Sequence, residues 1–291
     1  MKQYAPKVIL SGLVFPEGPR WHDGRLWFSD IHQHKVIAVD EHGKAETMVV
    51  TDDRPSGLGY LPGGDALIVQ MTARTLVRHS PRGTRPYADL SGLVQWFLND
   101  MVVDGKGRAY VGGRNHRPEG MPQNDVVVLV TTEGKARIAA DGMRGPNGSV
   151  VTPDGKTLIV AETHVGKLTA FDIAADGSLI NRRLWAQIAE DRTADGICLD
   201  AEGCIWVGSP RNKEFARVQQ GGKILDRITF ADKSAVACAL GGKDRRTLFL
   251  LTSRHDVKDL AMGRPLAEDV NSKSIGWIET VRVDVPGAGW P

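Results

Sequence analysis

PNGSVVTPDGKTLIVAET, residues 146–163, has the sequence of a β-hairpin that begins with a polar residue. A β-branched run at 149–152 and an apolar run at 158–161 have the length of strands. The PDGK segment between them has turn chemistry, because proline fixes φ and glycine permits positive φ. Asn147 stands eight residues before the turn glycine, Gly155. A polar residue, a hairpin and a turn glycine therefore define a frame that can be sought in the rest of the chain.

The same frame recurs along the whole sequence. Asp195, Asn99 and Ser56 each stand eight residues before a glycine in ADGICLDAEGCIWVGS, NDMVVDGKGRAYVGG and SGLGYLPGGDALIV. Glu17 begins a copy with a spacing of seven, and a looser copy begins near Ala235. The starts near 17, 56, 99, 147, 195 and 235 are 39 to 48 residues apart. That period is typical of the four-stranded blades of a β-propeller.

Two further short strands follow each hairpin, as VIAVD and ETMVV do in the first copy, and no segment has the pattern of an amphipathic helix of three turns. The sequence therefore predicts an all-β fold, a six-bladed β-propeller with four antiparallel strands per blade, as one domain over residues 1–291. A lone strand at 8–10 is expected to pair with the last blade and close the ring. Regular short strands also fit a β-sandwich, but the sixfold period favours the propeller.

Composition excludes several classes of partner. The chain has 291 residues, 41% hydrophobic and 25% charged, with a net charge of +2 and no basic block, so we expect neither nucleic acid nor an anionic membrane as partner. The N-terminus has no signal-peptide apolar region and no apolar span of 18 residues, which predicts a cytoplasmic protein. The odd number of cysteines without CxxC spacing predicts buried reduced thiols at Cys198, Cys204 and Cys238. The oligomeric state is left open.

The repeat also predicts where polar side chains meet. If each copy begins with the innermost strand, the leading residues form a ring at one mouth of the central channel. These residues are Glu17, Ser56, Asn99, Asn147, Asp195 and a small apolar residue near Ala235. Carboxylate and amide oxygens suit a hard divalent cation such as Ca²⁺ or Mg²⁺, and the absence of cysteine and histidine makes zinc less favoured. Any one of these pairs could simply begin a turn, but clustered carboxylates would be poorly solvated without a cation.

Four segments resemble those of a known family: FPEGPRW, LNDMVVDGKGRAYVG, GPNGSVVTPDGKTLIVAET and ADGICLDAEGCIWVG. The family is that of senescence marker protein, gluconolactonase and luciferin-regenerating enzyme, which are six-bladed propellers. The resemblance implies one bound divalent cation, usually calcium, held by Glu17, Asn147 and Asp195. It implies that Asn99 contacts the metal, its water or the substrate. The activity implied is hydrolysis of lactones and related esters.

One position departs from the family pattern. Gluconolactonase-type members often have an arginine two residues before the asparagine of the ND pair, and here Phe97 occupies that position, within Trp96-Phe97-Leu98. We therefore expect an apolar wall at the channel mouth, formed by Trp96, Phe97 and Leu98 with Met71. Hydroxyl groups buried without hydrogen bonds are costly and buried methylenes are favourable. This predicts small aliphatic γ- or δ-lactones as substrates in preference to sugar lactones.

The segments after each second strand are expected to return to the metal side of the ring. They contain His116, His164 and His255, which could orient substrate or move a proton, and Arg211, which could meet a carboxylate product. For each of these side chains, exposure to solvent without any role is the competing interpretation.

Two classes of function fit these observations. The first is a metal-dependent lactone hydrolase with a small-molecule substrate, in which Asp195 is both metal ligand and general base and Asn99 assists. Its substrate would be an aliphatic lactone or, alternatively, a sugar lactone. The second is a non-catalytic propeller that binds a ligand or a protein and uses the cation only to hold the channel together. Ca²⁺ is the expected ion, with Mg²⁺, Mn²⁺ and Zn²⁺ as alternatives.

Overall fold

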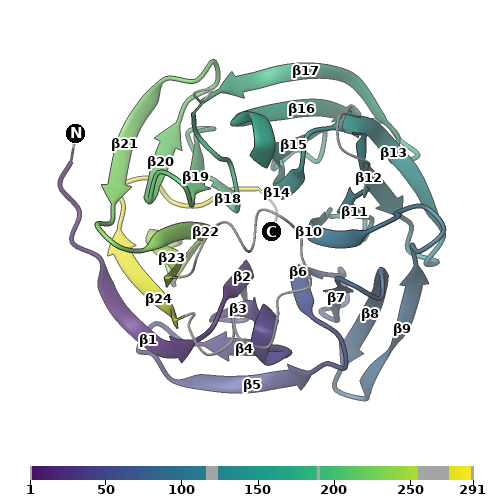
Figure 1. Ribbon diagram of the computed structural model, residues 1–291, viewed down its shortest axis with the longest axis horizontal. Coiled ribbons are helices and arrows are strands. Elements are labelled where there is room, and N and C mark those ends of the chain that lie inside the picture. Colours follow the sequence, from purple (N-terminus) through teal and green to yellow (C-terminus); the bar gives the residue numbers. More distant parts are fainter. Residues whose placement is uncertain (1, 116–123, 189–190, 255–274, 290–291) are drawn as a thin grey trace.

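The computed structural model describes residues 2–115, 124–188, 191–254 and 275–289. Six antiparallel sheets of four strands each stand in a ring (Figure 1). This confirms the six-bladed propeller, and the β-sandwich interpretation is wrong. Within the described ranges the only helices are two 3₁₀ turns, η1 (Ile31–Gln33) and η2 (Thr163–Val165).

The blades follow the chain in order, each from its inner to its outer strand. Blade 1 contains β2 (Pro16–His22), β3 (Arg25–Asp30), β4 (Lys35–Val39) and β5 (Ala45–Val50). Blade 2 contains β6 (Pro55–Tyr60), β7 (Ala66–Gln70), β8 (Thr75–Ser80) and β9 (Gly83–Asp89). Blade 3 contains β10 (Phe97–Val103), β11 (Ala109–Arg114), β12 (Asp125–Val130) and β13 (Ala136–Met143).

The second half of the ring repeats this plan. Blade 4 contains β14 (Pro146–Val151), β15 (Thr157–Glu162), β16 (Lys167–Ile173) and β17 (Leu179–Gln187). Blade 5 contains β18 (Ile197–Leu199), β19 (Ile205–Ser209), β20 (Glu214–Val218) and β21 (Ile224–Thr229). Blade 6 contains β22 (Ser234–Gly241), β23 (Thr247–Arg254) and β24 (Ile275–Arg282), with β1 (Lys7–Leu13) as its outer strand. The inner strands begin within two residues of the predicted starts.

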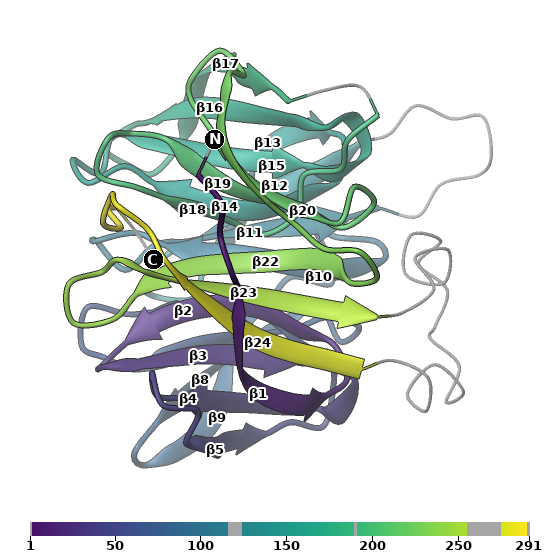
Figure 2. The same ribbon diagram turned by 90° about the vertical axis from the view of Figure 1, so that its left-hand side faces the viewer.

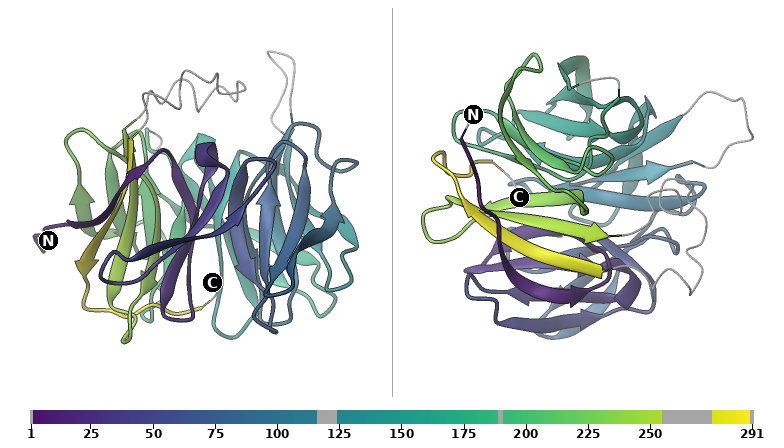
Figure 3. Two further views of the ribbon diagram at one scale, coloured as in Figure 1. Left: turned by 90° about the horizontal axis from the view of Figure 1, so that it is seen from below. Right: turned by 60° about the vertical axis from the view of Figure 1, so that its left-hand side comes forward.

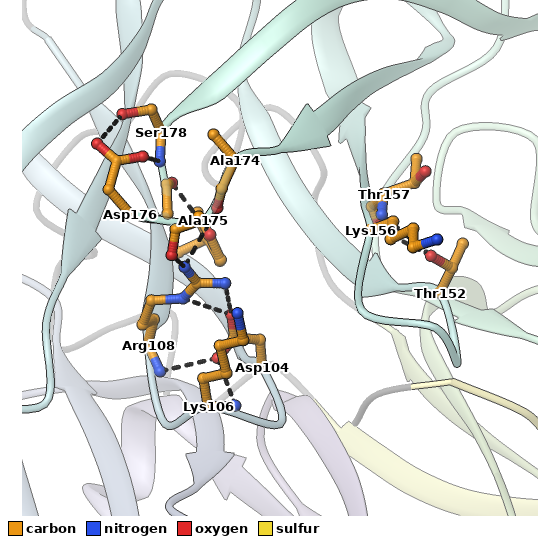
Figure 4. Close-up of polar contacts among 12 residues, drawn as sticks. Asp104, Lys106, Arg108, Thr152, Lys156, Thr157, Ala174, Ala175, Asp176 and Ser178 are labelled. Carbon is orange, nitrogen blue, oxygen red and sulfur yellow. Dashed lines mark hydrogen bonds and ion pairs between the residues drawn. The ribbon is translucent and has the colours of Figure 1, made fainter.

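The turn after the inner strand is held by an aspartate. Asp104 Oδ1 accepts the backbone N–H groups of Lys106 and Arg108 at 2.9 and 3.0 Å, an arrangement that fixes the chain reversal (Figure 4). Arg108 also donates to the carbonyl of Ala175 in blade 4, at 3.1 Å, so the turn ties two blades together. Asp200 makes the same backbone contacts in blade 5. The recurring Asp-x-x-Gly sequence is thus a structural turn, repeated on one face of the ring.

Apolar side chains of neighbouring blades form the core. Every residue of β12 is buried, because both faces of a blade are covered by its neighbours, and this explains why DVVVLV is a continuous apolar run after its first residue. One cluster joins Leu67 and Leu76 of blade 2 to Met101 and Val111 of blade 3. Packing between blades therefore holds the ring together.

Glycine follows the leading residue of the inner strand in four blades, at Gly18, Gly57, Gly148 and Gly196. A Cβ atom on Gly148 would lie 2.6 Å from the carbonyl oxygen of Asp195 and 2.6 Å from the backbone nitrogen of Ile197. Real Cβ atoms do not approach backbone so closely, so adjacent inner strands can come this near only at glycine. This close approach brings the leading polar residues together around the axis.

We expect Gly148→Ala to lower the free energy of unfolding by about 1–3 kcal/mol, because the added methyl group must displace the backbone of the next blade. Urea denaturation measures the change. Gly63→Ala is the matched control, since a Cβ there would meet nothing within 4 Å. Equal urea midpoints for the two variants would contradict this account of the close approach.

The two ends of the chain meet in blade 6. β1 pairs antiparallel with β24 along the outer edge, as the side view in Figure 2 shows, which confirms the predicted closure of the ring. After β24 the chain crosses the turn face, defined here as the face that carries the turn glycines. There the Ala201 N–H donates to Pro286 at 2.8 Å and the Ala288 N–H donates to Leu199 at 2.9 Å. The left view of Figure 3 shows this segment in yellow along the lower edge.

The cysteine prediction is confirmed: Cys198, Cys204 and Cys238 are free and buried. Among the residues that the structure describes, no helix has the length and apolar character needed to cross a membrane.

Candidate functional site

The predicted ring residues lie at the start of the inner strands, on the ligand face, which is the face opposite the turn glycines. Glu17, Ser56 and Asn147 are the second residues of β2, β6 and β14, and Asp195 lies two residues before β18. The Asp195 N–H donates to the Gly208 carbonyl at 2.9 Å, which continues the pairing of the blade up to the ring. Glu17, Asn147 and Asp195 are only 7%, 7% and 8% exposed. Three polar side chains from three blades are therefore withdrawn from solvent together.

Hydrogen bonds position Glu17 and Asn147, and a further hydrogen bond links Asn99 to the residue before Asn147. Glu17 Oε2 accepts the N–H of Gly18 at 2.8 Å. Asn147 Nδ2 donates to Thr163 Oγ1 at 3.1 Å, where η2 begins. The side-chain amide of Asn99 donates to the Pro146 carbonyl at 3.3 Å, so Asn99 is joined to the residue before Asn147. The two amides are thereby positioned by backbone and hydroxyl groups.

Two oxygens of the ring lack the hydrogen bonds that buried polar atoms normally make. Asn147 Oδ1 and Asp195 Oδ1 are buried without a hydrogen-bond partner in the described part of the chain. A buried acceptor without a donor costs free energy, and most such atoms in native proteins are satisfied by protein, water or an ion. Both oxygens are therefore available as ligands.

The electrostatics of the carboxyl groups of Glu17 and Asp195 also favour a bound cation. Burial raises the pKa of Glu17 well above its usual range, and the nearby carboxylates of Asp195 and Asp100 raise it further. Burial also raises the pKa of Asp195, with the Arg114 guanidinium opposing the rise and Asp100 adding to it. Two buried acids that disfavour ionisation would both become easier to ionise beside a bound cation.

These residues fit a divalent cation of the hard class. Their donors are carboxylate and amide oxygens, which Ca²⁺ and Mg²⁺ prefer, and the two carboxylates would offset the charge of the ion. Among the described residues no group of three or more His, Cys, Asp or Glu side chains could hold a metal, so a site of the usual zinc type is not present there. The ring differs from such a group because it mixes carboxylates with the amides Asn147 and Asn99.

A buried ion pair lies beneath the ring. Arg20 is 2% exposed and donates through Nη2 to Asp100 Oδ1 at 2.9 Å and to the Met101 carbonyl, and through Nη1 to the Pro19 carbonyl at 2.7 Å. Asp100 occupies the place that glycine has after the leading residue in four other blades. Its charge is neutralised across the channel by an arginine that is 80 residues away in sequence.

The predicted apolar wall is only partly formed. Leu98 is fully buried in the core between blades 2 and 3, so its expected place at the channel mouth is wrong. Side chains alternate along a strand, so Leu98 turns inward while its neighbour Phe97 does not. Trp96 and Phe97 are half-buried and pack edge to face at 4.8 Å between ring centroids. Met71 is partly buried against the same core, and its carbonyl accepts the Leu98 N–H at 3.0 Å.

The four residues predicted in loops on the metal side of the ring differ in their surroundings. His164 lies in η2, and its Nε2 is 2.7 Å from Nη1 of Arg114. Arg211 is exposed, and its backbone N–H donates to Thr193 Oγ1 at 3.3 Å. His116 and His255 lie outside the described residues.

Comparison with known proteins now identifies the family. A sequence model described as "SMP-30/Gluconolactonase/LRE-like region" matches residues 15–254. The chain belongs to this family. The match covers the inner strands of all six blades and every predicted metal ligand. The resemblance that the repeated segments indicated is thus confirmed.

Relatives of the family cover nearly the whole chain at low identity. A "6-deoxy-6-sulfogluconolactonase" from Pseudomonas putida is 25% identical over 292 residues, which span 98% of this chain and 96% of the relative. A regucalcin from Danio rerio is 23% identical over 81% of this chain and 82% of its own. The solved structure of a calcium-binding protein, regucalcin, from Agrobacterium tumefaciens is similar with a TM-score of 0.79 at 20% identity, over 99% and 97% of the two chains. At that identity the structural likeness supports the fold.

Three residues near the ring were missed by sequence reasoning: Arg20, Asp100 and Arg114. The aspartate after Asn99 was a signal that could have revealed Asp100, because four other blades have glycine there. Arg114 ends a second strand, within a segment that was expected on the ligand face, but arginine at a strand end is common enough to pass unnoticed.

Proposed function

We propose that the protein is a metal-dependent lactone hydrolase whose site is the ring on the ligand face. The observation that carries the proposal is the combination of two buried carboxyl groups with raised pKa values and two buried side-chain oxygens that make no hydrogen bond to any described residue. Such an arrangement is costly in a protein with no ligand and reasonable in one that binds a cation. Membership of a family with named lactonases supports the reaction class.

Glu17, Asn147 and Asp195 would hold the cation, with Asn99 beside it. A bound divalent cation would polarise the lactone carbonyl and offset the charge that develops on its oxygen. Calcium is our proposal for the ion because relatives are named regucalcin, and Mg²⁺, Mn²⁺ and Zn²⁺ are its alternatives. A single domain over 1–291 and a cytoplasmic location are further parts of the proposal.

Asp195 is the residue we assign as general base. It accepts a proton from the water whose oxygen attacks the carbonyl carbon, and the ring C–O bond then breaks as the proton passes to the leaving alkoxide. Beside a bound cation this carboxyl group would be ionised, as a proton acceptor must be. Asn99, held by its hydrogen bond to the Pro146 carbonyl, is placed to orient the water or the substrate.

For the substrate we propose a small aliphatic γ- or δ-lactone rather than a sugar lactone. Trp96 and Phe97, half-buried where β10 begins, present apolar surface three and two residues before Asn99. A sugar lactone is the alternative, and the relative named 6-deoxy-6-sulfogluconolactonase supports it. A binding protein without activity is the second alternative.

One experiment separates these alternatives. We expect the metal-loaded protein to hydrolyse γ-valerolactone with a higher kcat/KM than glucono-δ-lactone. EDTA should abolish both rates, because no metal ion would then polarise the lactone carbonyl. In Phe97→Arg the preference should move toward the sugar lactone, since a donor replaces an apolar side chain. Hydrolysis is followed by proton release in a weakly buffered assay with a pH indicator.

The contrary outcomes are distinct. Hydrolysis that survives complete removal of the metal would contradict metal dependence. A wild type that favours glucono-δ-lactone would replace the aliphatic class by the sugar class. No hydrolysis of any lactone by metal-loaded protein would favour the binding protein.

A further inference from the structure

A positively charged side chain lies beside the apolar residue at the channel mouth. β10 and β11 pair so that Phe97 and Arg114 are direct partners in the register. Directly opposed residues of an antiparallel pair project to the same face, with their Cβ atoms about 4.5–5.5 Å apart. Phe97 therefore has an arginine as its neighbour on the next strand.

Contacts within blades 3 and 4 fix the position of Arg114. Its side chain is largely buried, with 9% of the residue exposed. Its Nη1 lies 2.7 Å from Nε2 of His164, and because a guanidinium can only donate, that nitrogen must be the acceptor. Asp125 Oδ2 lies 3.7 Å from Arg114 Nη1. The Asp125 carboxylate also accepts the backbone N–H groups of Asn115 and Gly145, at 2.9 and 3.0 Å.

The packing also places the guanidinium against the segment that leads to one proposed metal ligand. A Cβ atom on Gly145 would lie 2.3 Å from Arg114 Nη1 and 2.7 Å from His164 Cδ2, so the cation fits against the chain only because this residue is glycine. Gly145 is two residues before Asn147. Arg114 is thus held against the segment that leads into the ring.

Placing an arginine here has no evident use for a neutral aliphatic lactone. A largely buried guanidinium next to an aromatic wall matches a ligand with an apolar ring and one oxyanion, because guanidinium groups bind carboxylate, sulfonate and phosphate oxygens through charge-assisted hydrogen bonds. The lactone ring would lie against Phe97, with its carbonyl toward the metal ligands and its acidic substituent toward Arg114.

We propose that Arg114 forms an anion subsite and that the substrate is a small lactone that carries an acidic group. The inference rests on the proposed lactonase function, whose substrate class it narrows. His164 is the positioning residue, since its acceptor nitrogen holds the guanidinium beside Gly145. The carboxylate formed when the ring opens is another oxyanion, and the test below distinguishes it from one already on the substrate.

The test compares two lactones of nearly equal shape, γ-valerolactone and 5-oxotetrahydrofuran-2-carboxylate, which have a methyl group and a carboxylate at the same ring position. We expect the wild-type kcat/KM to be about 10- to 100-fold higher for the acid, the range of a hydrogen bond to a charged group. The ratio should fall to near one in Arg114→Gln and recover in part in Arg114→Lys. Arg78→Gln, which alters an ion pair with Asp65 on β8, is the control and should keep the wild-type ratio.

A second measurement does not depend on turnover. Tetrahydrofuran-2-carboxylate has the ring and the acid but no lactone carbonyl, so it cannot be hydrolysed. Calorimetry should show that it binds to the wild type and to Arg78→Gln, and at least about 10-fold more weakly to Arg114→Gln. A circular dichroism melt of each variant checks that it is folded.

The outcomes separate this inference from the lactonase proposal. Hydrolysis of both lactones with a wild-type ratio near one, or a high ratio that Arg114→Gln retains, overturns the anion subsite and leaves the lactonase intact. Equal losses for both lactones in Arg114→Gln would show a structural or product-binding role and also overturn it. Binding of the non-hydrolysable acid through Arg114 without hydrolysis of any lactone would support the subsite while removing the lactonase. Neither binding nor hydrolysis would overturn both.

Discussion

Asp195→Asn is expected to lower kcat for lactone hydrolysis by about 10²- to 10⁴-fold, the usual contribution of a positioned general base. The asparagine keeps one oxygen that can bind a cation, so part of the metal affinity should remain. It cannot take a proton from the attacking water, and the lost rate reports this difference. The measurement is kcat at saturating metal, with metal content determined by elemental analysis of the same preparation.

Asp154→Asn is a suitable control, because that aspartate lies in a turn on the opposite face, where it accepts the Lys156 N–H at 3.1 Å. Its kcat should equal that of the wild type. Near-normal turnover of metal-saturated Asp195→Asn would move the base to another residue. The next candidates would be His116, His164 and His255, of which His164 would first have to lose the hydrogen bond that its Nε2 accepts from Arg114.

Arg20→Met is expected to lower the free energy of unfolding by about 3–5 kcal/mol, because it leaves the Asp100 carboxylate buried without its cation. Arg20 donates to Asp100 at 2.9 Å, and both side chains are almost fully buried. The double variant Arg20→Met/Asp100→Asn should recover a large part of the loss, since the uncompensated charge is then absent. Urea denaturation of the three proteins in EDTA gives the values without a contribution from bound metal.

Arg183→Met provides the contrast, because Arg183 pairs with Asp172 at 2.7 Å on the exposed outer part of blade 4. Exposed ion pairs contribute little to stability, so this variant should unfold at nearly the wild-type urea concentration. If Arg20→Met were no less stable than Arg183→Met, the buried pair would not be holding the channel together.

The fold could be predicted from the sequence because the same pattern of strands and turns is repeated several times along it. Each copy supplies a hairpin, a turn glycine at a fixed distance and two more strands, and a single weak copy such as the one near Ala235 is supported by the others. The ring residues followed from the same frame, since equivalent positions in a closed repeat lie at equivalent heights. Glu17, Asn147 and Asp195 are buried at the start of their blades as expected.

The remaining features depend on contacts that no repeat encodes. Arg20 of blade 1 pairs with Asp100 of blade 3, and the sequence around either residue does not indicate which residue it pairs with. The neighbourhood of Phe97 and Arg114 depends on strand register, which a hairpin with a β-bulge shifts. Leu98 was misplaced because three consecutive apolar residues were assigned to one surface, whereas a strand sends alternate side chains to opposite sides.

The pairing of β1 with β24 determines when the site can first exist. Residues 7–13 are synthesised before β24, their partner in the sheet, and until β24 is made blade 6 lacks its outer pair of strands. Glu17 belongs to the blade that follows this seam, whereas Asp195 belongs to the blade before blade 6. A nascent chain can fold individual blades, yet the last of these blades must close on the first before the carboxylates of Glu17 and Asp195 are held across a common axis. At the proposed site, cation binding would therefore follow the pairing of β1 with β24, which completes blade 6 between the blades of Glu17 and Asp195.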